Sequence, residues 1–314
     1  MGDSDVGVES VPDDLVLVDG LRAVLAERGV REVVVIERVP NRYSSTFASE
    51  LVTVTCDGRT DTVFCKHGGD RPDDGTGHRR GVPYEAAVYR LLDGTRAPSP
   101  RSAGSFETPL GSTLVLEWLR DGKRLAHSTA AMAVRAAAAA GAWQAGGAVD
   151  RHAGLNRYDA AHLDRWLDRA GATLDSGALG GAIEPAHLRH VADRLRDAVP
   201  TAIHGELFPS NVLVVGGDVR FVDWETAGFG PGEIDLAMLT AGGWPHETRR
   251  AAEQAYAAAR WPDGEPDGFA ETLAAAQLYA LVFVARHAVR RGELARPWVF
   301  EQAAAAAKAL RDAA

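Results

Sequence analysis

Two residue patterns divide the chain, and one short hairpin interrupts the second of them. β-Branched segments fill much of residues 31–67, whereas apolar residues recur at helical spacing from residue 129 onward. Within the helical part, residues 211–224 (NVLVVGGDVRFVDW) indicate two strands joined at residues 216–218. The chain is therefore expected to be an α+β protein, with a small sheet unit first and a helical unit that encloses the hairpin second.

The first part is predicted to be an antiparallel sheet with one helix. Strands are predicted at residues 31–39, 50–56, 61–67 and 112–119. Asp57 and Gly58 supply the hairpin turn between the second and third of these strands. Residues 82–92 predict a helix, and residues 97–109, which are rich in Pro and Ser, are expected to form a loop.

The second part is predicted to be mainly helical. Helices are predicted at residues 129–145, 159–171, 188–199, 247–260, 269–291 and 298–312. The expected domains are an acidic segment with a first helix (1–29), a sheet lobe (30–116), a hinge connector (117–124) and a helical lobe (125–314). A ligand site between two such lobes is the natural expectation.

The composition limits the partners that the chain can have. Its 314 residues, 46% of them hydrophobic, can bury a large core. Residues 1–20 hold six acidic residues and no Lys or Arg, so the rest of the chain has a net charge of about −3. Nucleic-acid binding normally needs clustered basic residues, so no nucleic-acid partner is expected.

The sequence also indicates a cellular location. No basic start followed by an apolar run is present, so a secretory signal is not expected. The longest apolar stretch, residues 273–285, ends at Arg286 and is too short to span a bilayer. Cys56 and Cys65 are the only cysteines and belong to no metal-ligand cluster. A reduced, cytoplasmic protein without a membrane partner is therefore expected.

Two residues of the first part match one need of phosphoryl transfer, a Lys that neutralises phosphate oxygens. Lys66 is one of only three lysines among 34 basic residues, and Glu85 follows it by 19 positions on the predicted helix. A carboxylate at this place can hold the ammonium group in position. Lys66 alone would equally suit a solvated strand end, so the pairing with Glu85 is what favours a functional role.

The segment HGELFPSN, directly before the hairpin, matches the other needs. Asn211 and Asp223 lie at the two ends of the hairpin, so a folded hairpin brings together two oxygen ligands of the kind that Mg²⁺ prefers. Asp223 lies in FVDW, an apolar strand where an unpaired carboxylate would be costly. His204 is expected to hydrogen-bond the loop backbone and orient Glu206, and Asp235 is expected to brace the same loop.

Together these residues resemble the aminoglycoside phosphotransferase and choline kinase family, which shares the bilobal protein-kinase-like fold. The resemblance covers the chain from about residue 30 to its end. It is carried by Lys66, Glu85, LVLEWL, HGELFPSN, FVDWETAGFGPGEIDLAML and the helical tail. Residues 41–47 (NRYSSTF) are a weaker match to the family's nucleotide-covering loop, because they lack G-x-G-x-x-G.

The resemblance implies that ATP binds between the lobes. The base would hydrogen-bond the connector backbone near Glu117 and Leu119. Lys66 would contact the α- and β-phosphates, and Ser44 and Ser45 would offer hydroxyl and N–H groups to the phosphates.

The resemblance also implies that Asn211 and Asp223 hold Mg²⁺ and that the acid at position 206 orients or deprotonates a substrate hydroxyl. Family members carry Asp there, whereas this chain carries Glu206. The two acids are similarly strong, so the longer arm can still accept a proton if the loop or the substrate shifts. A displacement of about 1 Å can instead cost roughly a hundredfold in rate. The alternative is thus an impaired binding or scaffold protein, but the retained nucleotide and metal residues favour an active kinase.

The acceptor is less constrained than the nucleotide. Aminoglycosides are polycations and need several carboxylates, yet residues 269–291 hold Glu271 against Arg286, Arg290 and Arg291. A small neutral or anionic hydroxyl compound, such as an antibiotic or a nucleoside-like natural product, is therefore expected. The alternative is Ser or Thr in a ribosomally made peptide, phosphorylated so that a partner lyase can eliminate the phosphate.

Overall fold

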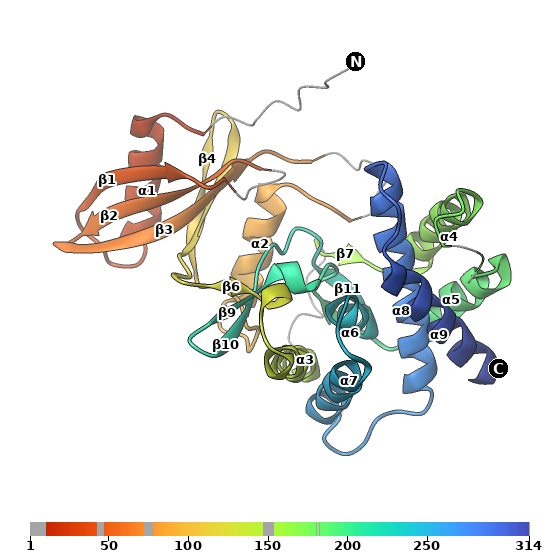
Figure 1. The fold of residues 1–314 in the computed structure, drawn as a ribbon. Coiled ribbons are helices and arrows are strands. Elements are labelled where there is room, and N and C mark those ends of the chain that lie inside the picture. Colours follow the sequence, from red (N-terminus) through yellow and green to blue (C-terminus); the bar gives the residue numbers. More distant parts are fainter. Residues whose placement is uncertain are drawn as a thin grey trace. The chain divides into compact units, whose positions relative to one another are not determined.

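The computed structural model describes residues 11–42, 47–71, 78–146, 154–179, 181 and 183–313. The chain forms two compact units, and Figure 1 labels most of their helices and strands. The first unit comprises Met1–Gly94, Ser99–Asp121 and Asp223–Thr226, and the second comprises Thr95–Pro98, Gly122–Val222 and Ala227–Ala314. The chain passes from the first unit to the second within the predicted connector at residues 117–124.

The first unit is built on a five-stranded antiparallel sheet. The strand order is β1 (Val33–Pro40), β2 (Ser49–Cys56), β3 (Arg59–Gly68), β5 (Gly111–Glu117) and β4 (Ser102–Thr108). Helix α1 (Asp14–Ala26) buries Leu17 and Leu21 against strand residues such as Val54. The β2–β3 turn has positive φ at Asp57 (48°) and Gly58 (79°), the conformation that a two-residue hairpin requires.

The strand β4 lies where a loop was predicted, so that prediction was wrong. Its sequence SAGSFET has few β-branched residues, and it forms a strand because it pairs with the apolar strand β5 along its length. Gly104 has a φ of 136°, and a Cβ there would lie 3.0 Å from Val24 of α1. Pairing with β5 and close packing on α1 therefore make this segment a strand. Its own composition does not predict either contact.

The second unit is mainly helical. Its helices are α3 (Ala130–Ala145), α4 (Ala160–Asp175), α5 (Pro185–Asp197), α6 (Glu233–Thr240), α7 (His246–Arg260), α8 (Phe269–Arg290) and α9 (Pro297–Ala313). The predicted hairpin is present, with Val212 paired to Phe221 and Val215 paired to Asp218. It joins a small sheet in the order β10 (Asp218–Phe221), β9 (Val212–Val215) and β6 (Lys123–Arg124).

A second small sheet of this unit was not predicted. Its order is β7 (Asn156–Arg157), β11 (Gly228–Pro231) and β8 (Pro200–Ile203), and the 3-10 turns η1 (Leu125–His127) and η2 (Pro209–Asn211) complete the unit. Strands of two to four residues are too short to show a periodic pattern. Strand β8 leads directly into HGELFPSN, so this sheet sets the position where that segment begins.

Helix α8 is longer than the apolar stretch seen in the sequence. It has 22 residues and is the one helix of the described residues that is long and apolar enough to cross a membrane by length and composition. Of its most apolar window, 61% is buried inside the protein. This burial is the behaviour of a core helix.

Candidate active site

Lys66 is held by two carboxylates within the first unit. Its Nζ donates to Glu85 Oε2 at 2.6 Å and to Asp223 Oδ1 at 2.7 Å. Strand β3 presents Lys66, and helix α2 (Val82–Leu92) presents the buried Glu85, whose other oxygen accepts the Trp224 N–H at 3.2 Å. Burial disfavours the ammonium charge, but Asp223 and Glu85 outweigh it and raise the pKa of Lys66. The lysine is therefore charged and fixed in place.

Asp223 has an unusual backbone conformation. Its φ is 69°, in the left-handed region that residues other than glycine seldom adopt, although Asp tolerates it better than most. Its side chain is 40% exposed, whereas that of Glu85 is 2% exposed. Strain of this kind clusters at functional sites, and here it directs an accessible carboxylate toward Lys66.

A third carboxylate, which the sequence analysis missed, completes this cluster. Glu225 Oε2 lies 3.9 Å from Lys66 Nζ, and its other oxygen lies 3.5 Å from Arg79 Nε. Burial, and then the charge of Asp223, raise the pKa of Glu225 to about 8. The available signal was its spacing, an acid two residues after Asp223 in FVDWE.

The segment HGELFPSN forms a loop of the second unit that is buried at residues 204–207 and braced by one carboxylate. Asp235, on α6, accepts the backbone N–H groups of His204 at 2.8 Å and Gly205 at 2.9 Å. Gly205 has a φ of 84°, which glycine adopts at little cost. The His204 ring is fully buried, with Nε2 donating to the Val222 carbonyl at 3.0 Å and Nδ1 accepting the Glu206 N–H at 3.4 Å.

The far end of this loop is tied to the hairpin. Asn211 Nδ2 donates to the Glu206 carbonyl at 2.9 Å, and the Val222 N–H donates to the Asn211 carbonyl at 2.9 Å. Asp223 is the next residue of the chain after Val222. The loop thus joins His204, Glu206 and Asn211 in one hydrogen-bonded group. Asp223 directly follows Val222, the hairpin residue that bonds to this loop.

Aromatic side chains of the loop, of α4 and of α8 stack in pairs. Phe208 of the loop stacks on Phe283 at 5.6 Å between ring centroids, and Tyr279 stacks on Trp166 at 5.2 Å. Tyr279 also shares a 2.8 Å hydrogen bond with His162 Nε2. Burial, together with the negative charge of Glu206, raises the pKa of Tyr279. The sequence analysis missed these contacts. The name aromatic wall is used below for Phe208, Phe283, Tyr279, Trp166 and His162.

Four of the predicted nucleotide-binding residues remain. Ser44 and Ser45 lie outside the described residues. Glu117 ends β5, and its carboxylate accepts from Arg101 Nε at 2.9 Å, while Leu119 is buried. The roles assigned to their backbone groups stay predictions.

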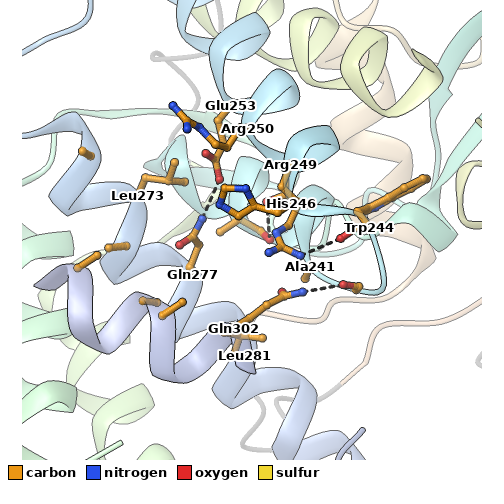
Figure 2. A pocket seen from close by; sticks show the side chains of 18 of the residues that line it. Ala241, Trp244, His246, Arg249, Arg250, Glu253, Leu273, Gln277, Leu281 and Gln302 are labelled. Atoms are coloured by element: carbon orange, nitrogen blue, oxygen red, sulfur yellow. Dashed lines mark hydrogen bonds between the residues drawn. The ribbon is translucent and has the colours of Figure 1, made fainter. Parts of the chain in front are cut away.

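A separate cavity of about 630 Å³ lies among α6, α7, α8 and α9 (Figure 2). Some of its polar groups bond one another: Arg249 Nη1 donates to the Trp244 carbonyl at 2.8 Å, and Gln277 donates to Glu253 at 3.0 Å. Helix α8 lines it with Gln277 and Leu281, on a different face from Tyr279 and Phe283. The cavity is thus distinct from the aromatic wall.

A lysine clamped by carboxylates in a sheet unit, and a braced acidic loop beside a hairpin in a helical unit, define a protein-kinase-like phosphotransferase. The chain belongs to the phosphotransferase enzyme family, whose model matches residues 57–290. The predicted family, the α+β kinase-like fold and the kinase class of enzyme are thereby confirmed.

Solved structures share the fold at low sequence identity. The choline kinase LicA of Streptococcus pneumoniae has 14% identity and a TM-score of 0.56, over 93% of this chain and 98% of that one. A choline/ethanolamine kinase family protein of Mesorhizobium loti has 14% identity and a TM-score of 0.54, over 93% and 94%. A putative fructosamine-3-kinase of Haemophilus somnus has 17% identity and a TM-score of 0.53, over 93% and 97%. No curated protein matches the sequence.

Proposed function

We propose that this protein transfers the γ-phosphate of ATP to a hydroxyl group of a small neutral or anionic molecule. The observation that carries the proposal is the clamp on Lys66, which two carboxylates hold at 2.6 and 2.7 Å. A charged lysine fixed in this way suits the phosphate oxygens of a nucleotide. Both cysteines of the chain are free, consistent with a cytoplasmic location, where ATP is available.

The charges around Lys66 fit a bound metal ion. Three carboxylates, those of Glu85, Asp223 and Glu225, surround one ammonium group, so an added cation reduces their repulsion. Within the described part of the chain, no group of three His, Cys, Asp or Glu side chains is arranged as a metal site. Mg²⁺ commonly uses one or two carboxylates with phosphates and waters. We assign Asn211 and Asp223 as its protein ligands, where it would neutralise charge on the transferred phosphoryl group.

Glu206 is proposed to act on the acceptor. It accepts the proton of the substrate hydroxyl as that oxygen attacks the γ-phosphorus, while the bond to the β-phosphate oxygen breaks and ADP leaves. The contacts of His204 and Asn211 with the Glu206 backbone support this role, since they fix where the side chain starts.

The aromatic wall supports a compact acceptor with an apolar or ring portion. Phe208 and Phe283 are only partly buried and can offer ring surface, whereas Tyr279 and Trp166 are buried and stack on each other. None of these four side chains adds a carboxylate beside Glu206. A polycation would need several carboxylates there. The similar structures named above are kinases whose names give small molecules, choline, ethanolamine and fructosamine.

An ATP-consumption screen tests the proposal. The purified chain is given ATP and Mg²⁺ with neutral hydroxyl natural products, nucleosides, aminoglycosides, choline-like alcohols or Ser/Thr peptides, and products are checked by mass for one added phosphate. We expect turnover with a small neutral or anionic acceptor, and Glu206→Gln should remove it while leaving ATP binding intact. Transfer only to peptides would establish the peptide-kinase alternative, and ATP binding without any transfer would indicate a binding or scaffold protein.

A further inference from the structure

Asp235, which braces the catalytic loop, is one end of a buried series of hydrogen bonds that joins three helices. Gln144 Nε2 of α3 donates to Asp235 Oδ2 at 3.0 Å, and Tyr256 of α7 donates its hydroxyl proton to Gln144 Oε1. Arg260 Nη1, one turn further along α7, donates to the Tyr256 oxygen at 2.6 Å and to Glu233 at 3.0 Å. Exposure is at most 8% for all five side chains.

Arg260 fixes the direction in which the hydrogen bonds of this series run, from Arg260 toward Asp235. An arginine can only donate, so the Tyr256 oxygen accepts from Arg260 and its single proton must point to Gln144. The Gln144 carbonyl then faces Tyr256, and its NH₂ group faces Asp235. A flipped Gln144 amide would place an oxygen against the carboxylate, which is repulsive. The charge of Arg260 thus determines that Asp235 receives a donor.

Two glycines make this arrangement possible. A Cβ on Gly141 of α3 would lie 2.4 Å from the Tyr256 carbonyl oxygen, so α3 and α7 touch here through backbone atoms. A Cβ on Gly232, the residue before α6, would lie 2.4 Å from Gln144 Oε1 and 2.5 Å from Arg260 Nη1. Helix packing has therefore closed around these polar groups, which are paired with one another.

We propose that Gln144, Tyr256 and Arg260 are positioning residues for phosphoryl transfer, which hold both oxygens of Asp235 on the catalytic loop and so fix Glu206. This inference rests on the proposed function, because Glu206 matters only if it meets an acceptor. Asp235 reaches Glu206 through the two residues whose N–H groups it accepts, His204 and Gly205. Gln144, Tyr256 and Arg260 are called the relay below. They touch neither the nucleotide nor the acceptor.

The ionisation of Asp235 supports the same role. Burial raises its pKa to about 7, and the donors His204, Gly205 and Gln144 and the charge of Arg260 partly oppose this rise. The charged and titratable groups near it are His204 of the loop, Glu233 of α6, and Tyr256 and Arg260 of α7, while α3 contributes the neutral Gln144. Loss of the relay therefore raises the pKa of Asp235 further and neutralises it at a higher pH.

Hydrogen exchange tests this relay without needing any activity. Tyr256→Phe removes the hydroxyl that joins Arg260 to Gln144, and we expect the His204 and Gly205 amides to exchange about tenfold faster, as loss of a hydrogen bond to a charged group implies. Thr272→Val removes another buried hydroxyl, on α8, and should leave this exchange unchanged. Equal protection of the loop in Tyr256→Phe and the wild-type protein would overturn the proposal.

A second pair of variants keeps the test open if Tyr256→Phe does not fold. Arg260→Lys retains a donor-only cation, whereas Arg260→Gln can also accept and loses the direction. We expect loop protection to be largely kept by Lys and lost by Gln, and equal protection in both would overturn the relay.

Activity then separates positioning from stability. In Tyr256→Phe we expect kcat to fall about tenfold with an unchanged KM for ATP. We also expect the acidic limb of the plot of kcat against pH to move to higher pH. An unmoved limb despite lower kcat would show a purely structural role. If no acceptor is phosphorylated at all, the proposed function fails, and the exchange result still decides whether the relay braces the loop.

Discussion

At the scale of single residues, the cluster around Lys66 carries more negative charge than one lysine neutralises. Glu85 and Glu225 are both buried, and burial raises the pKa of each; the charge of Asp223 adds to this rise and that of Lys66 opposes it. Glu225 has the weaker contact with the lysine, because its carboxylate lies 3.9 Å from Lys66 Nζ while that of Glu85 lies at 2.6 Å. The cluster thus stores unfavourable charge that a bound cation would relieve.

This stored charge predicts how stability depends on pH. Folding raises the pKa of Glu225 from 4.5 to about 8, so between these values the folded protein keeps a proton that the unfolded chain has lost. Stability therefore falls with rising pH in this window, by about 1.4 kcal/mol per pH unit for this group. The side chain in Glu225→Gln cannot ionise. The free energy of unfolding of this variant, minus that of the wild-type protein, should therefore increase from pH 5 to pH 8 in denaturant titrations.

The control for this measurement is Glu247→Gln, which changes an exposed residue of α7. Its difference from the wild-type protein should stay constant over the same range. A constant difference for Glu225→Gln as well would mean that Glu225 is not held protonated in the folded state.

Glu206 gives a second prediction at this scale, concerning the length of its side chain. If the site is built for Glu, Glu206→Asp withdraws the carboxylate by one methylene and should lower kcat by about a hundredfold. The KM for ATP should not change, because the backbone contacts of the loop are retained. Steady-state kinetics on the best acceptor measures both quantities. A higher kcat for the Asp variant would instead show that Glu206 impairs an ancestral site.

Residue spacing singled out Lys66, Glu85 and Asp223, which the structure brings together, and it did so for a physical reason. Lys66, Glu85, Asn211 and Asp223 stand in segments whose order and local pattern show where each strand, helix or hairpin ends. The aromatic wall could not be found in this way, since Tyr279 and His162 are 117 positions apart and each looks like an ordinary helix residue. The relay behind Asp235 was hidden too, because Gln144 and Tyr256 lie 112 positions apart on helices rich in alanine.

At the scale of elements, helices α3 and α7 approach each other closely at Gly141. Helix α3 buries Ala133, Ala136, Ala137 and Ala140, and Gly141 lets the Tyr256 carbonyl approach its backbone. Small side chains bring helix axes together, so polar groups carried at the contact, such as Gln144, can reach across it. Helix periodicity predicted both helices, but it does not encode which faces meet, and short strands such as β8 have no period to detect.

Two glycine substitutions separate close packing from helix propensity. Gly141→Ala places a methyl group 2.4 Å from the Tyr256 carbonyl oxygen and should destabilise the protein by about 1–3 kcal/mol through overpacking. Gly171→Ala, in the interior of α4, meets nothing within 4 Å and should stabilise it by roughly 0.5–1 kcal/mol. Chemical denaturation measures both changes. Stabilisation by Gly141→Ala would show that α3 and α7 do not touch there.

At the scale of the whole molecule, the first unit is completed by a distant piece of chain. Asp223–Thr226 belongs to it although residues 122–222 lie in the second unit, and Lys66 and Asp223 are separated by 157 positions. The Lys66 cluster therefore needs the chain to return to the first unit after residues 122–222. A ligand at the cluster consequently stabilises contacts that depend on both parts of the chain.

Nucleotide binding should accordingly raise the melting temperature of the full chain. A ligand at a hundredfold excess over its Kd adds about 2.7 kcal/mol, which corresponds to several degrees for a protein of this size. We expect ATP with Mg²⁺ to produce this shift in differential scanning fluorimetry. Lys66→Ala should abolish it, because the phosphates lose their cation and three carboxylates remain there. Lys308→Ala, at a side chain that is 72% exposed, should keep the full shift, and the lack of any shift in the wild-type protein would exclude ATP as its cofactor.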